Sequence, residues 1–203
     1  MLTLVHKFIN MRSFFFFFLL ITSISNATAQ ALKDVIKADT ILAAKMIKEG
    51  ANPNEKDANG TTILMDVCHF PNLPVAVFLL RHGATVDQPR SPKGRTALMV
   101  ACAYWCGADM VKLLVANGAD VNIQSDDGTT ALMLAAQNEK LDVVIYLLQH
   151  GADPAKKNKA GTSALDLAMA GKVEDYMIKS VKDTRFDKDQ VIEELKKATA
   201  HNK

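Results

Sequence analysis

The stretch GADVN, residues 118–122, decides the fold, because the chain repeats it at nearly constant spacing. It recurs at residues 151–154 as GADP and, in weaker form, at residues 50–54 and 83–87. Each copy is followed ten or eleven residues later by a second glycine, which opens a G-x-T-x-L phrase with serine replacing threonine in the last copy. These glycines are Gly60, Gly94, Gly128 and Gly161. They are 34, 34 and 33 residues apart. A repeat period of this length predicts stacked helical repeats.

Each unit contains residues suited to two helices and a glycine that ends the second helix. Residues 131–136 are rich in alanine, which lets neighbouring inner helices approach closely, and residues 141–148 predict a longer outer helix that is apolar on most faces. Gly151 follows, and glycine readily adopts the left-handed conformation that ends a helix. Since one unit cannot bury its own apolar face, the stack is expected to fold together.

The chain resembles the ankyrin-repeat family over roughly residues 31 to 182. The family's repeat pattern, G-x-T-P-L-x-x-A-A followed by two helices and G-A-D-V-N, matches this sequence four times in register. This resemblance implies an all-α ankyrin-repeat solenoid of about five helix-turn-helix units with hairpin-like loops and polar caps. The family's proline is replaced by Ile63, Ala97, Ala131 and Ala164, and its histidine by Met65, Met99, Met133 and Asp166. We expect the methionines to fill the core, and Thr62, Thr96 and Thr130 to cap the inner helices.

The repeat register divides the chain into four parts. We assign residues 1–29 to a secretory signal peptide, 30–58 to an N-terminal capping repeat, 59–182 to ankyrin repeats, and 183–203 to a C-terminal capping helix and tail. In the last part, Val191, Ile192 and Leu195 are expected to dock the final helix, while its charged residues face water.

The N-terminal residues predict export. Met11-Arg12-Ser13 precedes eight unbroken apolar residues, 14–21, and small residues follow at 27–29. A basic start, a short apolar core and small residues at the cut are typical of a secretory signal. The apolar run is too short to span a bilayer, so stable membrane insertion is not expected. We expect the mature chain to begin at Gln30, from a start at either Met1 or Met11, in a bacterial periplasm or outside the cell.

Charge argues against nucleic-acid binding. The chain has 24 basic and 22 acidic residues, and removing Lys7 and Arg12 with the leader leaves 22 of each. A domain without net charge and without a long basic stripe is a poor nucleic-acid binder.

The three cysteines favour structural thiols. Cys68 and Cys102 fall at equivalent places in adjacent units, where residue 136 is alanine. Neighbouring helices pack roughly 8 to 10 Å apart, beyond disulfide reach. Both cysteines are therefore interpreted as buried fillers, and Cys106 as the thiol most open to reaction or to an intermolecular bond.

No constellation of residues predicts catalysis, a cofactor or a metal site. His82 and His150 each precede a helix-ending glycine and are interpreted as donors to the helix C-terminus. His69 has no neighbours at zinc-ligand spacing, and Asp126 and Asp127 alone make a weak calcium site. The sequence therefore predicts a binding protein without enzymatic activity.

The resemblance implies that partners bind to the loop tips and the exposed ends of the inner helices. Repeat three is the least regular, because its loop and its inner turn each carry one extra residue. Trp105 in that turn is either an exposed interface residue or a plug over the core. The positions that we select as partner-binding are Asn59, His69, Phe70, Arg90, Lys93, Arg95, Tyr104, Trp105, Asp126, Asp127, Gln137 and Asn138.

These expectations give one leading function and one alternative. The leading hypothesis is an exported protein-binding module, monomeric when unbound, that inhibits or protects against a periplasmic enzyme such as a peptidoglycan hydrolase. The inhibitory or protective role rests on analogy with bacterial periplasmic ankyrin proteins. The alternative is a redox or stress-response protein that acts through Cys106.

Overall fold

Short helices alternate with long loops along the chain. The computed structural model describes residues 47, 49–69, 71–90, 93–104, 107–170 and 188–201. The inner helices are α4 (Ile63–His69), α6 (Ala97–Ala103), α8 (Ala131–Gln137) and α10 (Ala164–Ala170). The outer helices are α5 (Leu73–Arg81), α7 (Ala108–Ala116) and α9 (Leu141–Gln149), and α12 (Lys188–His201) lies near the C-terminus. Within the described ranges there is no strand, so the all-α prediction is confirmed.

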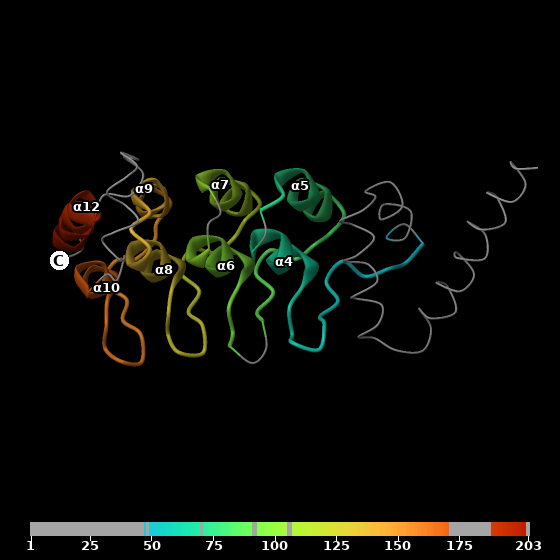
Figure 1. Cartoon of the computed structure of the whole chain (residues 1–203), viewed down its shortest axis with the longest axis horizontal. Helices are drawn as coiled ribbons and strands as arrows, with labels where there is room; N and C mark the ends of the chain where they lie inside the picture. The colour runs from blue at the N-terminus through green and yellow to red at the C-terminus, as the bar shows by residue number, and fades with distance from the viewer. Residues whose placement is uncertain are drawn as a thin grey trace, which may run out of the picture.

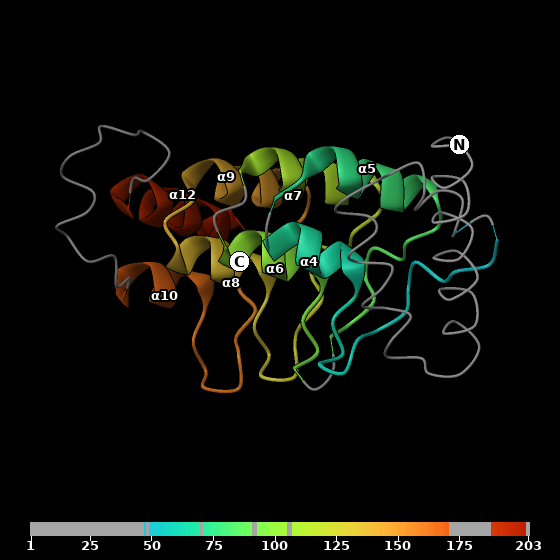
Figure 2. The ribbon, with the colours of Figure 1, turned by 45° about the vertical axis from the view of Figure 1, so that its right-hand side comes forward.

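The helices form two layers. Figure 1 shows α4, α6, α8 and α10 side by side in one row, with α5, α7 and α9 in a second row above them. The loops that join successive units project from the inner-helix row, away from the outer helices, as Figure 2 also shows. The units α4–α5, α6–α7 and α8–α9 each contribute one helix to each layer, and α10 extends the inner row, which is the predicted solenoid.

Threonine hydroxyls cap the N-termini of three inner helices, as predicted. The backbone N–H groups of Met65, Met99 and Met133 donate to the hydroxyl oxygens of Thr62, Thr96 and Thr130, at 3.3, 3.4 and 3.3 Å. The last inner helix uses a reciprocal version, in which Ser163 Oγ accepts from Asp166 N and Asp166 Oδ2 accepts from Ser163 N. Ser163 Oγ also donates to Asp166 Oδ2 at 2.7 Å, and the backbone and hydroxyl bonds from Ser163 to the carboxylate lower the pKa of Asp166.

One expected result follows for these caps. Thr130→Ala removes the hydroxyl that satisfies an otherwise unpaired N–H of α8, so the free energy of unfolding should fall by about 1 kcal/mol. Thr130→Ser keeps the hydroxyl and should lose much less. Urea denaturation followed by circular dichroism compares the two variants, and equal losses would show that the methyl group, rather than the cap, matters.

The core lies between the two helix layers. Leu98, Leu132 and Val111 are at most 1% exposed, and so are Met65, Met99 and Met133. The methionines therefore fill the core, as predicted. Cys68 and Cys102 are fully buried thiols, which confirms their interpretation as structural residues.

A histidine followed by a glycine ends the outer helices α5 and α9. His82 Nδ1 lies 2.8 Å from the Phe78 carbonyl oxygen, and His150 Nδ1 lies 2.8 Å from that of Tyr146. Each imidazole also stacks on the aromatic ring of the residue whose carbonyl oxygen it contacts. The ring centroids are 4.2 Å apart for His82 and Phe78 and 3.9 Å apart for His150 and Tyr146. The next residue in the α9 unit, Gly151, has φ +84°, a left-handed conformation that costs glycine little. Both histidines are thus used within the fold, as the sequence indicated.

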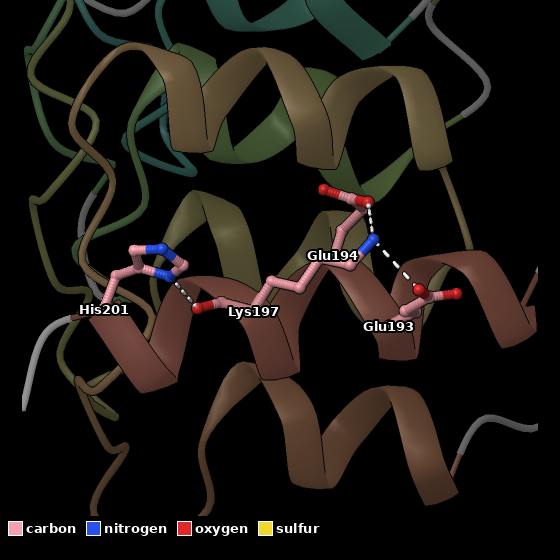
Figure 3. Close-up of polar contacts among 4 residues, drawn as sticks. All are labelled: Glu193, Glu194, Lys197 and His201. Carbon is pink, nitrogen blue, oxygen red and sulfur yellow. Dashed lines mark hydrogen bonds and ion pairs between the residues drawn. The ribbon is translucent and has the colours of Figure 1, made fainter.

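Helix α12 packs against the last units, beside α9 and α10 (Figure 1). Val191 and Leu195 are buried, and Ile192 is half-buried, as expected of the docking face. On its outer side, Lys197 Nζ lies 2.9 Å from Glu193 and 3.1 Å from Glu194 (Figure 3). These carboxylates raise the pKa of Lys197. Residues 188–201 thus form a helix at the C-terminal end of the stack. The predicted signal peptide, most of the predicted N-terminal capping repeat and residues 171–187 lie outside the described part.

Candidate protein-binding face

The described candidate residues gather in two clusters on the inner-helix side of the stack. One cluster, here called the helix-end cluster, lies at the C-terminal ends of the inner helices. The other, the loop cluster, lies in the projecting loops before the N-termini of those helices (Figure 2). A seven-residue helix is about 10 Å long, so the two clusters border opposite ends of each inner helix. Together the two clusters contain every predicted partner-binding residue that the structure describes. The helix-end cluster contains His69, Tyr104, Gln137 and Asn138, and the loop cluster contains Asn59, Arg90, Lys93, Arg95, Asp126 and Asp127.

The centre of the helix-end cluster is a stacked pair of rings. His69 is the last residue of α4 and Tyr104 is the C-cap of α6, so adjacent units bring them together. Their ring centroids are 3.9 Å apart with an interplanar angle of 21°. His69 is exposed and Tyr104 retains 37% of its surface. The pair presents an exposed aromatic surface with polar atoms at its rim, a combination typical of interface anchors.

A buried lysine holds the backbone beneath this pair. Lys140, in the turn between α8 and α9, is 7% exposed, and its ammonium group donates to the carbonyl oxygens of Ala101, at 3.3 Å, and of Tyr104. It therefore bonds the C-terminal end of α6 from the following unit. Because one acceptor belongs to Tyr104, the same contact helps to fix the position of the exposed ring.

The two candidate amides on α8 differ in availability. Asn138 Nδ2 donates to the Leu134 carbonyl oxygen at 2.7 Å, so this side chain caps its own helix. Gln137, next to it, is exposed. Of the two, Gln137 is the better placed to contact a partner.

The loop cluster is built on backbone hydrogen bonds. Arg90 and Arg95 pair across the base of their loop, where Arg90 N donates to the Arg95 carbonyl oxygen at 2.7 Å. Asn59 N donates to a carboxylate oxygen of Asp57 at 2.8 Å, which shapes the preceding loop. The side chain of Asn59 is exposed, while those of Arg90 and Arg95 are half-buried. These bonds fix the backbone that carries the side chains of Asn59, Arg90 and Arg95.

Neighbouring loops are also bonded to each other. Asp126 N donates to the Lys93 carbonyl oxygen at 3.1 Å, and Lys159 N donates to the Asp127 carbonyl oxygen at 2.9 Å. The side chains of Lys93, Asp126 and Asp127 are exposed, so both positive and negative groups lie along the loop edge. The edge is therefore continuous and of mixed charge.

Asp127 has a defined structural role besides its exposure. Its Oδ1 accepts from Ser125 Oγ at 2.5 Å and from Thr129 N at 3.1 Å. These bonds, helped by the charge of Arg95, lower the pKa of Asp127 to about 2. Among the described residues no group of acidic, histidine or cysteine side chains is arranged to hold a metal ion.

Three residues of the notable third repeat and its neighbour lie outside the described residues. They are Phe70 and Trp105, both predicted to bind the partner, and Cys106, the thiol of the alternative hypothesis.

None of the helices in the described ranges is both long and apolar enough to cross a membrane.

Sequence reasoning did not find Lys140 or its neighbour Glu139. Glu139 is 5% exposed and has φ +54°, a left-handed conformation that favours glycine. Burial raises its pKa, and Lys188 at the start of α12 opposes that shift. Charged residues in a turn normally face water, so their type gave no sign of burial. No local feature of the sequence marked this pair as buried.

These features define a class of protein: a helical-repeat solenoid with an ordered, exposed face suited to binding another protein. A family model described as ankyrin repeats (3 copies) matches residues 32–125 and 105–182. The chain belongs to the ankyrin-repeat family. Proteins of this family are typically non-enzymatic modules for protein–protein interaction.

Curated relatives share the repeats over part of their length. A putative ankyrin repeat-containing protein of Treponema pallidum is 38% identical over 80 residues, which is 39% of this chain and 26% of that protein. The ankyrin repeat and KH domain-containing protein mask-1 of Caenorhabditis elegans is 30% identical over 105 residues, 51% of this chain and 4% of its own. A putative ankyrin repeat protein of Acanthamoeba polyphaga mimivirus is 57% identical over 44 residues, 20% of this chain and 8% of its own. The matches thus span about a quarter or less of these relatives.

Proposed function

We propose that this chain is an exported binding protein that holds a folded protein partner against the helix-end and loop clusters. The observation that carries this proposal is the exposed His69–Tyr104 stack, which adjacent units and the buried Lys140 hold in place. A rigid aromatic surface loses little conformational entropy on binding, so its buried area contributes effectively to affinity. The mixed charge of the loop edge would then select the partner's orientation.

The compartment and the consequence of binding are further parts of the proposal. The basic, apolar and small-residue pattern of residues 11–29 supports export to the bacterial periplasm or beyond. A partner in that place would be a folded protein such as a peptidoglycan hydrolase, which a rigid surface can inhibit by covering its active site. The chain would in this way regulate a cell-wall enzyme or protect the cell against it.

The first test captures the partner from the source organism. The full chain, with its own leader and a C-terminal affinity tag, is expressed there, and proteins bound to it are identified by mass spectrometry. We expect one cell-wall enzyme to be enriched, and His69→Ala with Tyr104→Ala to reduce its binding at least tenfold, the typical scale for an interface anchor.

A matched control separates the position of the stack from its chemistry. Tyr146 and His150 make a similar stack, with centroids also 3.9 Å apart, but on the outer helix α9. Replacing both with alanine should leave capture unchanged once the thermal stability of each double variant has been checked. Equal loss from the two double variants would contradict the assignment of the binding face.

The same preparation tests export. The tagged chain should appear in the periplasmic fraction or the medium, and mass spectrometry of its first peptide should show Gln30 at the N-terminus. Recovery only from the cytoplasm, with the leader retained, would overturn the periplasmic part of the proposal while leaving protein binding to be judged by capture.

Adding the chain to the purified enzyme should lower its turnover, and unchanged turnover at saturating binding would rule out inhibition.

A further inference from the structure

Two junctions between successive units are made by an asparagine side chain. Asn54 Nδ2 donates to the Gly83 carbonyl oxygen at 2.8 Å, and Asn54 Oδ1 accepts from Thr85 N at 2.6 Å. Asn122 repeats the arrangement one junction further on, with distances of 2.7 Å to the Gly151 carbonyl oxygen and 2.8 Å from Asp153 N. Each amide therefore uses one donor and one acceptor to hold the next unit.

The junction between these two contains an aspartate instead. Asp87 stands four residues after Gly83, as Asn54 stands four after Gly50 and Asn122 four after Gly118. Its Oδ2 accepts from Asp120 N at 2.9 Å, which is the acceptor bond of the asparagine junctions. Its Oδ1 is buried and, within the described part of the chain, is the side-chain polar atom found buried without a hydrogen-bond partner.

The repeat register identifies what Oδ1 faces. In the asparagine junctions the second side-chain atom is Nδ2, and its acceptor is the carbonyl oxygen of the helix-ending glycine. The corresponding glycine here is Gly118, two residues before Asp120. An ionised carboxylate has only acceptors, so at this junction two oxygen atoms stand where the others have a donor and an acceptor.

We propose that Asp87 is a pH-dependent link in the repeat stack. When its carboxylate takes a proton from solvent, the new Oδ1–H group donates to the Gly118 carbonyl oxygen. The junction then has the two bonds that asparagine makes permanently at the neighbouring junctions. Acidification would therefore tighten the stack at its middle, between the second and third loops of the described repeats.

The charges around Asp87 are compatible with this switch. From the following loop, the Asp120 carboxylate faces it and disfavours a second negative charge, while Asp120 N–H favours ionisation. From the preceding loop, Lys56 Nζ donates to the Pro89 carbonyl oxygen at 2.6 Å, two residues after Asp87. Asn54 and Thr85 beside it are uncharged. Burial is the largest influence, and the net result is a raised pKa for Asp87.

The sign of the pH dependence follows from this direction. A carboxyl whose folded-state pKa lies above its unfolded value binds more protons when folded, so it contributes stability at low pH. That contribution is complete below the unfolded pKa, near 3.8, and is lost as the pH rises through the folded pKa.

Asp87→Asn and the reverse change, Asn122→Asp, make a matched pair for testing the link. At pH 7.5, Asp87→Asn should lower the unfolding equilibrium constant about tenfold, the scale of one buried hydrogen bond. Near pH 3.5 this variant and the wild type should be equally stable. Asn122→Asp should raise the constant by a similar factor at pH 7.5 and recover as the pH falls.

A local measurement accompanies the unfolding curves. Solenoid units depend mainly on their nearest neighbours, so hydrogen exchange at the Asp120 amide should slow on acidification more than the chemistry of exchange alone explains. In Asp87→Asn this extra slowing should disappear. The proposal is overturned if Asp87→Asn changes stability equally at both pH values, if it changes neither, or if the Asp87 carboxyl carbon titrates by NMR at or below the ordinary aspartate pKa.

Discussion

Gly128→Ala should destabilise the chain by about 3 kcal/mol, because the new methyl group would strike the backbone of the next loop. Gly128 has φ +80°, and a Cβ built there lies 2.9 Å from the Asn158 Cα and 3.0 Å from Lys159 N. Both atoms belong to main chain, which cannot move aside as the end of a flexible side chain could. Urea denaturation gives the change in the free energy of unfolding.

Gly151→Ala is the matched control for that result. Gly151 has nearly the same backbone conformation, with φ +84°, but no atom lies within 4 Å of a Cβ built there. This substitution should therefore cost only the left-handed strain of alanine, about 1 kcal/mol. Equal losses from the two variants would show that the loops are not packed as closely as their interatomic distances indicate.

Lys140→Met should be the second large effect, with a loss of about 2 kcal/mol. Methionine keeps most of the apolar stem but leaves the carbonyl oxygens of Ala101 and Tyr104 without their ammonium donor. Removing a buried charge can itself stabilise a protein. Here the two bonds to carbonyl oxygens offset the cost of burying the ammonium group, and hydrogen bonds from charged donors are the stronger kind.

The control for this substitution is Lys112→Met, at an exposed position on the outer helix α7. It should change stability by less than about 0.5 kcal/mol. Both variants are compared by urea denaturation, and Lys140→Met should also weaken partner capture, because Tyr104 loses a support. A more stable Lys140→Met variant would show that the desolvation penalty of the lysine exceeds its hydrogen bonds.

The repeat register was predictable because it depends on residues close together in sequence. The spacing of Thr62, Thr96 and Thr130 predicted the helix starts, and the equivalence of Cys68 and Cys102 predicted their burial; both predictions are confirmed. The His69–Tyr104 contact follows the same logic, since both residues end inner helices of adjacent units.

Other features depend on what the following unit places against a side chain. Nothing local distinguishes the buried Lys140 from a solvated lysine. Likewise, Asp87 could be read as a loop aspartate until the asparagine junctions on either side showed what a second side-chain atom normally does there. The signal for Asp87 was present in the alignment of the units, but its energetic meaning required the hydrogen bonds.

The backbone bonds between loops bear on how such a chain can lengthen. Asp126 N bonds to Lys93, and Lys159 N to Asp127, through main-chain atoms alone. An inserted copy of a unit would therefore meet matching donors and acceptors on both sides, whatever its exposed side chains were. The glycines at the close approaches, Gly94 and Gly128, and junction residues such as Asn122 would have to be kept. Duplication could thus extend the molecule while leaving its surface open to divergence.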